Sequence, residues 1–243
     1  MSGHSHWHSI KVKKGVADAK KSQLFSKLAR EISIAAREGP NPEFNSKLKM
    51  AIEKAKSINM PTENIERAIK RGSGQNEEMR LEEIILEAYG PSGAAILIEA
   101  ITDNKKRTLS AVKKILSQYD GKLAGEGAVK WMFERKGAIT INLNAQTELK
   151  EKEKLELLAI ESGADDIVWR NDILNVYTKD KDLDKVKEIL EKKGVKTESA
   201  SLDWVPKEEI NIDDSAKQTC QKLFEALDED DDVQEIYSNV NLE

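Results

Sequence analysis

The spacing of the apolar residues changes once along this chain, across a polar stretch at about residues 72–82. Before it, apolar residues such as Leu24, Leu28 and Ile32 recur at three- and four-residue steps, which is the period of a helix with one buried face. After it, short apolar runs alternate with turn residues and helical stretches. The pattern predicts an α+β protein, with an N-terminal helical bundle followed by two α/β sandwich domains.

Three short helices are expected in the bundle. The first covers about residues 17–37. The second is expected to begin with Asn41 as its N-cap and Pro42 in its first turn, with Phe44 on its buried face. The third ends at the cluster Gly72-Ser73-Gly74. Short loops between the three helices favour a compact bundle over separate helices.

The middle domain is predicted to be built from two separate stretches of the chain. Strands at 84–89 and 94–102 flank Gly90-Pro91-Ser92-Gly93, which predicts a hairpin. The other expected elements are a helix around 109–116, strands at 129–133, 206–212 and 233–240, and a helix at 213–227. The tail is thus expected to complete a sheet that the first stretch begins.

Residues 137–204 read strand, helix, strand, strand, helix, strand, which is the ferredoxin-like βαββαβ order. This unit is expected to be inserted into the middle domain. The predicted domains are residues 1–78, residues 79–136 with 205–243, and residues 137–204.

The two ends of the chain carry opposite charge. Residues 1–72 hold 15 of the 39 Lys and Arg residues but only 7 of the 44 Asp and Glu residues, a net charge of +8. The remainder carries −13. A basic segment attached to an acidic body indicates a polyanionic partner for that segment, most often nucleic acid.

Basic side chains follow one side of the first predicted helix. At about 100° per residue, Lys20, Lys27, Arg30 and Arg37 fall in one sector. The alternative is an ordinary solvated face, and the helix dipole by itself accounts for cations at the end of the third helix. The candidate nucleic-acid-binding residues are Lys11, Lys13, Lys14, Lys20, Lys21, Lys27, Arg30, Arg37, Lys70, Arg71 and Arg107.

Lys105, Lys106 and Arg107 stand at the start of the helix around 109–116, where the helix dipole disfavours positive charge. Such a placement costs folding energy unless an anion or an acidic side chain lies nearby. Asp103 is one candidate neighbour, and a phosphate site is the alternative.

His4, His6 and His8 alternate, so an extended chain would point all three imidazoles one way. A metal site is one interpretation. We favour a tail that becomes ordered on its partner, with Trp7 stacking on a base or entering a groove.

No linear catalytic motif is present. The sequence lacks a Gly-rich phosphate loop, a paired zinc motif and a nucleophile elbow, so we expect a binding protein without cofactor or resident metal. The one cysteine, Cys220, is expected to be buried packing. The acidic run 228–232 lacks the spacing of a calcium loop and is predicted to be a solvated turn.

No apolar run of about 18 residues is present to span a bilayer, and the N-terminus lacks the apolar core of a signal peptide. We expect a cytoplasmic protein without membrane contact.

The chain resembles the YebC family, which includes the mitochondrial translational activator of cytochrome c oxidase subunit one. The matching residues are Gly3-His4-Ser5, Trp7, Ile10-Lys11, Lys14, Asp18, Lys20, Phe25, Lys27-Leu28, Arg30-Glu31, Ala35-Ala36, Asn59-Met60-Pro61, Arg67-Ala68-Ile69-Lys70, Thr102-Asp103-Asn104, Arg107-Thr108, Gly121, Leu123, Gly127, Val129, Trp131-Met132-Phe133, Lys136-Gly137, Ile160-Glu161, Gly163-Ala164 and Asp231-Asp232-Val233-Gln234. His6 and His8 depart from it, since the family usually has Lys or Arg at the first position and a small or polar residue at the second.

The resemblance implies three domains around a cleft and a role as a probable transcriptional regulator that binds DNA. It also keeps a second hypothesis open, a translation factor bound to the ribosome or to messenger RNA through the same basic helices. An enzyme that uses the interdomain cleft comes last. Neither the nucleic-acid sequence recognised nor the oligomeric state follows from these residues.

Overall fold

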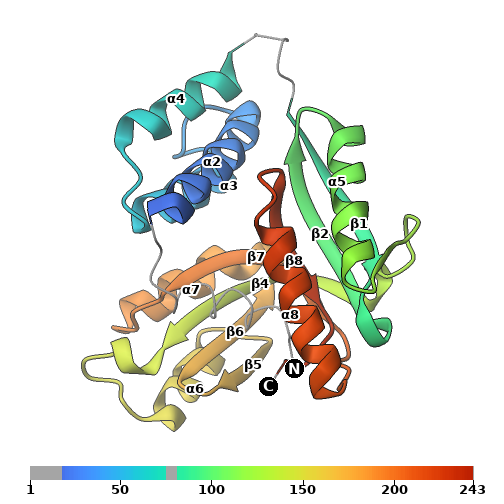
Figure 1. The fold of residues 1–243 in the computed structure, drawn as a ribbon. Helices are drawn as coiled ribbons and strands as arrows, with labels where there is room; N and C mark the ends of the chain where they lie inside the picture. Colours follow the sequence, from blue (N-terminus) through green and yellow to red (C-terminus); the bar gives the residue numbers. More distant parts are fainter. Residues whose placement is uncertain (1–17, 75–80, 243) are drawn as a thin grey trace.

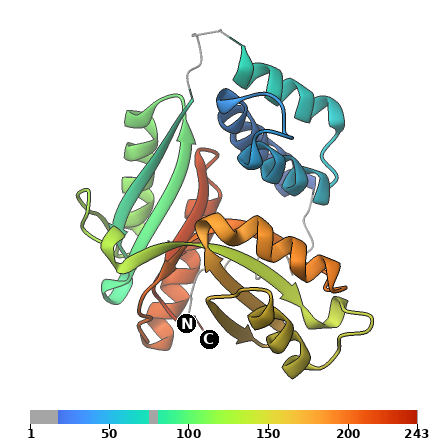
Figure 2. The same ribbon diagram turned by 180° about the vertical axis from the view of Figure 1, so that it is seen from behind.

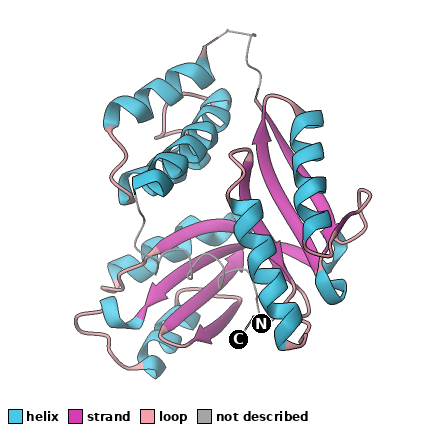
Figure 3. Cartoon of the chain, viewed as in Figure 1, coloured by secondary structure: helices cyan, strands magenta, loops and turns pink. Residues whose placement is uncertain are grey.

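The computed structural model describes residues 18–74 and 81–242. It contains an N-terminal helical bundle and two four-stranded antiparallel sheets, each with helices packed on it (Figure 1). Colouring by secondary structure shows that the bundle is purely helical and that strands occur only in the other two parts (Figure 3). The expected α+β class is confirmed.

The bundle consists of α2 (Asp18–Ala35), α3 (Ser46–Ser57) and α4 (Thr62–Ser73). Its core is formed by the apolar positions that recur with the helical period. The buried residues are Leu28, Ile32, Ala35, Ala36, Leu48, Ala51, Ile52, Ala55, Met60, Ile65 and Ala68. The helical spacing before residue 72 therefore identified these buried positions, with Phe44 as an exception.

The predicted start of the second helix is wrong by four residues. Asn45 is the N-cap of α3, and its side chain accepts a hydrogen bond from the Leu48 backbone N–H. The Asn41 side chain instead accepts from the Glu43 backbone N–H within the preceding turn. Phe44 consequently lies outside the helix and is 88% exposed. Both asparagines are capping residue types, so only the backbone path distinguishes them.

The first sheet has the order β3-β1-β2-β8. Its strands are β1 (Glu82–Tyr89), β2 (Ala95–Thr102), β3 (Lys122–Leu123) and β8 (Val233–Ser238). Helices α5 (Lys105–Gln118) and α8 (Asp214–Asp228) share one hydrophobic core with this sheet. Cys220 lies in that core, and burial raises the pKa of its thiol to about 11. The tail thus completes the sheet, as its apolar pattern predicted.

The second sheet has the order β5-β6-β4-β7. Its strands are β4 (Phe133–Asn142), β5 (Asp166–Arg170), β6 (Ile173–Lys179) and β7 (Ser199–Pro206). Helices α6 (Lys152–Glu161) and α7 (Leu183–Lys192) pack against β4 and β6. The chain order and strand order together are those of a ferredoxin-like unit. Seen from behind, this unit lies below the helical bundle and beside the first sheet (Figure 2).

Two predicted strands are absent from the described part of the chain. Residues 130–132 form a short 3-10 helix instead of a strand, because the buried Glu87 carboxylate accepts the backbone N–H groups of Gly127, Val129 and Lys130. Those groups cannot also donate to a neighbouring strand. Residues 207–212 contain only one bridge, from Ile210 to Val240.

The limits of the inserted domain stay a prediction. Strand β4 runs without a break through residue 136, and β7 continues to Pro206. Glu134 pairs with Val205 and Lys136 with Asp203, so the two ends of the predicted insertion lie side by side.

We expect a variant without residues 137–204, with Lys136 joined to Val205 by a short Gly/Ser linker, to unfold cooperatively. The adjacent strand ends mean that the first sheet keeps its strands and its helices. Denaturant unfolding followed by circular dichroism measures this, with residues 137–204 alone as the companion sample. Loss of cooperative unfolding in both samples would contradict separate domains.

Candidate nucleic-acid interface

The structure places the predicted site residues in three different settings. Lys11, Lys13 and Lys14 lie outside the described residues, as do His4, His6 and His8. Lys20 lies within α2. Lys21 is exposed, with its ammonium 6.0 Å from the centroid of the Phe25 ring. The remaining candidates on α2 contact other parts of the protein.

Lys27 is buried, with only 5% of its surface exposed. Its ammonium donates to the carbonyl oxygen of Asp228 at 2.6 Å and to the carboxylate of the same residue at 3.0 Å. One turn earlier on α2, the Gln23 amide donates to the Glu229 carbonyl at 2.8 Å. The acidic turn, residues 228–232 between α8 and β8, therefore lies directly against α2 (Figure 1).

Arg30 extends the same contact. Its guanidinium donates to the Asp231 carbonyl at 2.8 Å and to the Asp232 carboxylate, and it reaches the Ile101 carbonyl at 3.2 Å. Further along the chain, the Arg37 guanidinium donates to the Leu81 carbonyl. Of the cations that the helical period placed in one sector, Lys27, Arg30 and Arg37 thus face the protein itself. The prediction that residues 228–232 form a solvated turn is wrong for Asp228 and Asp232.

Asp232 is the centre of a polar cluster, with 8% of its side chain exposed. Its carboxylate accepts from the Thr108 hydroxyl at 2.6 Å, from Thr102 at 3.1 Å and from the Arg107 guanidinium at 2.9 Å. Burial alone would raise the pKa of this carboxyl group, but the hydrogen bonds from Thr108, Arg107 and Arg30 outweigh it and lower the pKa from 3.8 to about 2. Asp232 is therefore a charged structural residue.

The same cluster accounts for Arg107, one of the three cations at the start of α5. Arg107 donates to Asp103 at 2.7 Å as well as to Asp232. These carboxylates compensate the unfavourable position of Arg107 near the helix N-terminus. The sequence left two interpretations of this helix start open, an acidic neighbour or a phosphate site. For Arg107 the structure contains acidic neighbours. Asp103 was visible in the sequence, whereas Asp232 is 125 residues away from Arg107.

A second ion-pair cluster connects α3 to the rest of the chain. Lys54 lies 2.9 Å from Glu235 on β8 and 3.5 Å from Glu31 on α2. Burial lowers the pKa of Lys54, but these carboxylates outweigh burial and raise it above its usual range. Glu53 on the same helix pairs with Lys187 on α7 at 2.8 Å. Lys54 keeps part of its side chain in solvent while it pairs with these carboxylates, and the bundle is bound by charge to both sheet domains.

A different set of cations on the bundle faces solvent. Lys70 and Arg71 on α4 are exposed, as is Arg67 one turn before them. On α3, Lys49 and Lys56 are also exposed. Among the residues that the structure describes, no carboxylate forms an ion pair with any of these five. The sequence had identified them as basic, but helical spacing alone did not separate them from the inward-facing cations of α2.

Trp131 is a surface feature that sequence reasoning had not singled out. It is 64% exposed, and its indole N–H donates to the Ala128 carbonyl at 3.0 Å. The loop that carries it is fixed by the three backbone hydrogen bonds to Glu87. An aromatic ring is thus exposed on a loop that hydrogen bonds hold in place.

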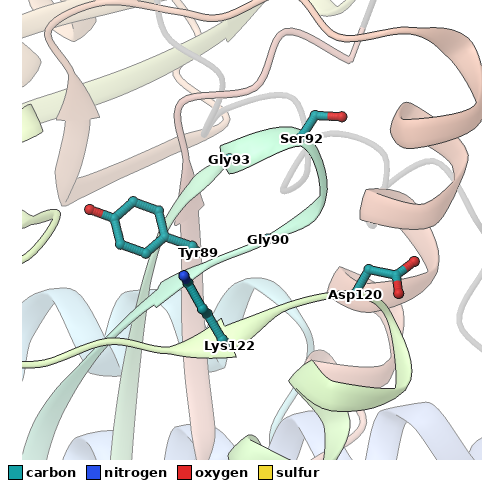
Figure 4. A pocket seen from close by; sticks show the side chains of 6 residues that line it. All are labelled: Tyr89, Gly90, Ser92, Gly93, Asp120 and Lys122. Atoms are coloured by element: carbon teal, nitrogen blue, oxygen red, sulfur yellow. The ribbon is translucent and has the colours of Figure 1, made fainter.

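The shallow pocket drawn in Figure 4 lies at the end of the first hairpin and is lined by Tyr89, Gly90, Ser92, Gly93, Asp120 and Lys122. Its one cation and one carboxylate point to separate sides, and the Lys122 ammonium lies 5.8 Å from the Tyr89 ring centroid. It contains none of the predicted nucleic-acid-binding residues.

Within residues 18–74 and 81–242, no three His, Cys, Asp or Glu side chains gather where they could bind a metal ion. In that same part of the chain, none of the helices combines the length and the apolar composition needed to cross a bilayer.

Two family models match the chain in succession. The model described as "TACO1/YebC protein N-terminal domain" matches residues 5–75, and that described as "TACO1/YebC second and third domain" matches residues 81–240. The boundary between the matches coincides with the change from helical bundle to sheets.

Full-length relatives are similar over the whole chain. Proteins named "Probable transcriptional regulatory protein" from Pseudothermotoga lettingae, Aquifex aeolicus and Halothermothrix orenii are 48%, 47% and 45% identical over 244 residues. The alignments cover 100% of this chain and 95%, 96% and 96% of those proteins, respectively. A solved structure, "Crystal Structure of a Conserved Hypothetical Protein Aq1575 from Aquifex Aeolicus", superposes with a TM-score of 0.87 at 45% identity, covering 94% of this chain and 93% of that chain.

Proposed function

Because the chain belongs to the TACO1/YebC family, we propose that it is a DNA-binding regulator of transcription in the cytoplasm. The basic helical bundle is the part that contacts nucleic acid, and the protein acts by binding and not by catalysis. The names of the relatives from Pseudothermotoga lettingae and Aquifex aeolicus support a regulatory role.

The observation that carries the proposal is the set of exposed cations on α3 and α4, namely Lys49, Lys56, Arg67, Lys70 and Arg71. They belong to the segment with net charge +8, whereas the remainder of the chain carries −13. An acidic body repels phosphate, so it directs a nucleic acid towards the bundle. Flexible cations with solvent around them are the usual source of phosphate contacts and of counterion release.

The surface supplies charge without a group of side chains that would read bases. An Asn or Arg set at the start of one recognition helix is typical of sequence-specific binders. On α4, Lys70 and Arg71 stand at the opposite, C-terminal end of the helix, and Arg67 lies near its middle. We therefore expect weak, salt-sensitive and sequence-tolerant binding to duplex DNA.

We expect the triple variant Arg67→Ala, Lys70→Ala, Arg71→Ala to bind duplex DNA more weakly. The slope of its salt dependence should be flatter by about 0.9 for each phosphate that the variant no longer neutralises. The measurement is fluorescence anisotropy on a labelled duplex of about 20 base pairs, across a series of salt concentrations. The slope is the diagnostic quantity, because replacing cations in the last turn of α4 also changes the helix dipole interaction.

The matched control is Lys113→Ala, Lys114→Ala, Lys222→Ala, which removes the same charge from exposed positions on α5 and α8. Its slope is expected to stay close to that of the unaltered protein. An equal flattening in both variants would mean that net charge, and not the bundle surface, controls binding.

Naked DNA and a ribosome both present phosphate, so this assay does not separate transcription from translation. Sedimentation of endogenous protein at physiological salt separates them. Transcription regulation requires the protein to remain with the nucleoid and to mark discrete promoters. Co-sedimentation with ribosomal particles that resists DNase, with release by the bundle variant, would refute it in favour of the translation role.

A further inference from the structure

We propose that the acidic turn, residues 228–232, covers a further nucleic-acid-binding surface of the bundle, on α2, as an internal substitute for phosphate. In this arrangement Lys27 and Arg30 become available to nucleic acid only when the helical bundle separates from the turn. The inference rests on the proposed function, because it concerns a second basic surface of the same helical bundle, on α2.

The acceptors in this contact resemble those of a phosphate backbone. Lys27 and Arg30 are bound by carboxylate and carbonyl oxygens from Asp228, Asp231 and Asp232. Anionic oxygens are the acceptors that Lys and Arg also find on nucleic-acid phosphates. The predicted phosphate-binding side chains therefore already have anionic partners, supplied by the chain itself.

The contact between the bundle and the acidic turn is polar. The core of the bundle is made only of residues from the bundle, and the core of the first sheet contains none of them; the apolar contact of the bundle is made elsewhere, by Met50 of α3 against the core of the second sheet. The described contacts between α2 and the acidic turn are hydrogen bonds from Gln23, Lys27 and Arg30. Polar interdomain interfaces permit relative domain motion, and their ion pairs weaken as salt rises.

The acidic turn also lies where it would obstruct a ligand of α2. It projects from the end of α8 towards α2, and both views show it between the bundle and the first sheet (Figures 1 and 2). A nucleic acid that binds α2 at Lys27 must displace this turn. If only a fraction of the molecules has the bundle separated from the turn, the apparent affinity for nucleic acid equals the intrinsic affinity multiplied by that fraction.

Asp228→Asn tests this competition. The change removes the carboxylate that binds Lys27 and leaves the backbone carbonyl in place. Asp228 is also the last residue of α8, where a negative charge opposes the helix dipole, and its carbonyl remains as an acceptor for Lys27, so both effects limit the destabilisation. We expect the affinity of the full-length protein for the same DNA duplex to rise about fivefold, a typical size for coupling between two states.

Glu229→Gln is the matched control, because it makes the same charge change in the same turn. Its side chain is exposed, and its contribution to the contact is the backbone carbonyl that accepts from Gln23. Its affinity for the duplex is expected to change less than about twofold, since a single exposed charge acts weakly at this range.

A distance measurement adds a readout that does not depend on affinity. Fluorophores at Ser46→Cys on α3 and Ser215→Cys on α8 occupy exposed positions, and Cys220 is buried. Energy transfer is expected to fall when saturating duplex is added to the full-length protein. It is expected to be lower in Asp228→Asn before any duplex is present.

The outcomes separate the two proposals. Equal affinities of Asp228→Asn and Glu229→Gln, or energy transfer that saturating duplex leaves unchanged, would overturn the competition while leaving nucleic-acid binding intact. Failure of every variant, including Asp228→Asn, to bind duplex DNA would refute the proposed function and the competition together.

Discussion

Replacing Asp232 with alanine is expected to lower the free energy of unfolding by about 3 kcal/mol. The substitution leaves Thr102, Thr108 and Arg107 without the acceptor that they share, and it removes the charge that Arg30 faces. A buried polar cluster that loses its central acceptor incurs the desolvation cost of every remaining group. Denaturant unfolding monitored by circular dichroism measures the change.

Asp232→Asn tests the contribution of the carboxylate charge alone, because the amide has nearly the same shape and retains an acceptor oxygen. The lowered pKa, from 3.8 to about 2, corresponds to about 2 kcal/mol at neutral pH. For a carboxyl group with a depressed pKa, this stabilisation is present above the ordinary value of 3.8 and is lost as pH falls towards 2. The stability gap between unaltered protein and Asp232→Asn should therefore narrow below about pH 4. A gap that persists unchanged down to about pH 2 would show that the carboxylate charge is not its source.

Gly72→Ala is expected to destabilise the helical bundle by about 3 kcal/mol. A Cβ atom at this position would overlap the backbone carbonyl group of Ser33 on α2, and backbone atoms cannot rotate away as a long side chain can. The same close approach allows the Ser33 hydroxyl to donate to the Ala68 carbonyl at 2.9 Å. Hydrogen exchange of the α2 and α4 amides reports the destabilisation, because it resolves the bundle from the sheet domains.

Gly125→Ala is the control for this substitution, since a Cβ there meets no atom within 4 Å. It is expected to leave exchange in the bundle unchanged. Equal exchange rates in the Gly72→Ala and Gly125→Ala proteins would mean that α2 and α4 have room to separate without any cost in packing.

The role of Gly72 shows one limit of sequence reasoning. The sequence indicated a helix end there, and α4 does end nearby, at Ser73. Gly72 itself lies inside the helix, where its missing side chain permits contact with α2. Termination and close packing both favour glycine, so the residue type alone does not distinguish them.

The α2 cations show a second limit. Helical spacing correctly grouped Lys27 and Arg30, because angular position on a helix depends only on local geometry. Whether that sector met solvent or protein depended on Asp228 and Asp232, which are 201 and 202 residues further along the chain. No local pattern contains that information.

The sequence by itself determined most of the elements, their order and most of the buried positions, because the periods of helices and strands follow from backbone geometry. It did not determine the 3-10 helix at residues 130–132 or the exposure of Phe44, which depend on contacts and on the path of the backbone. It also determined the charge division, and many ordered matches were enough to indicate the family. Tertiary structure alone decided which cations are exposed, which glycine packs against a backbone and which carboxylate is a structural centre. Each of these depends on contacts between side chains far apart in sequence, and such contacts exist only after the domains have packed.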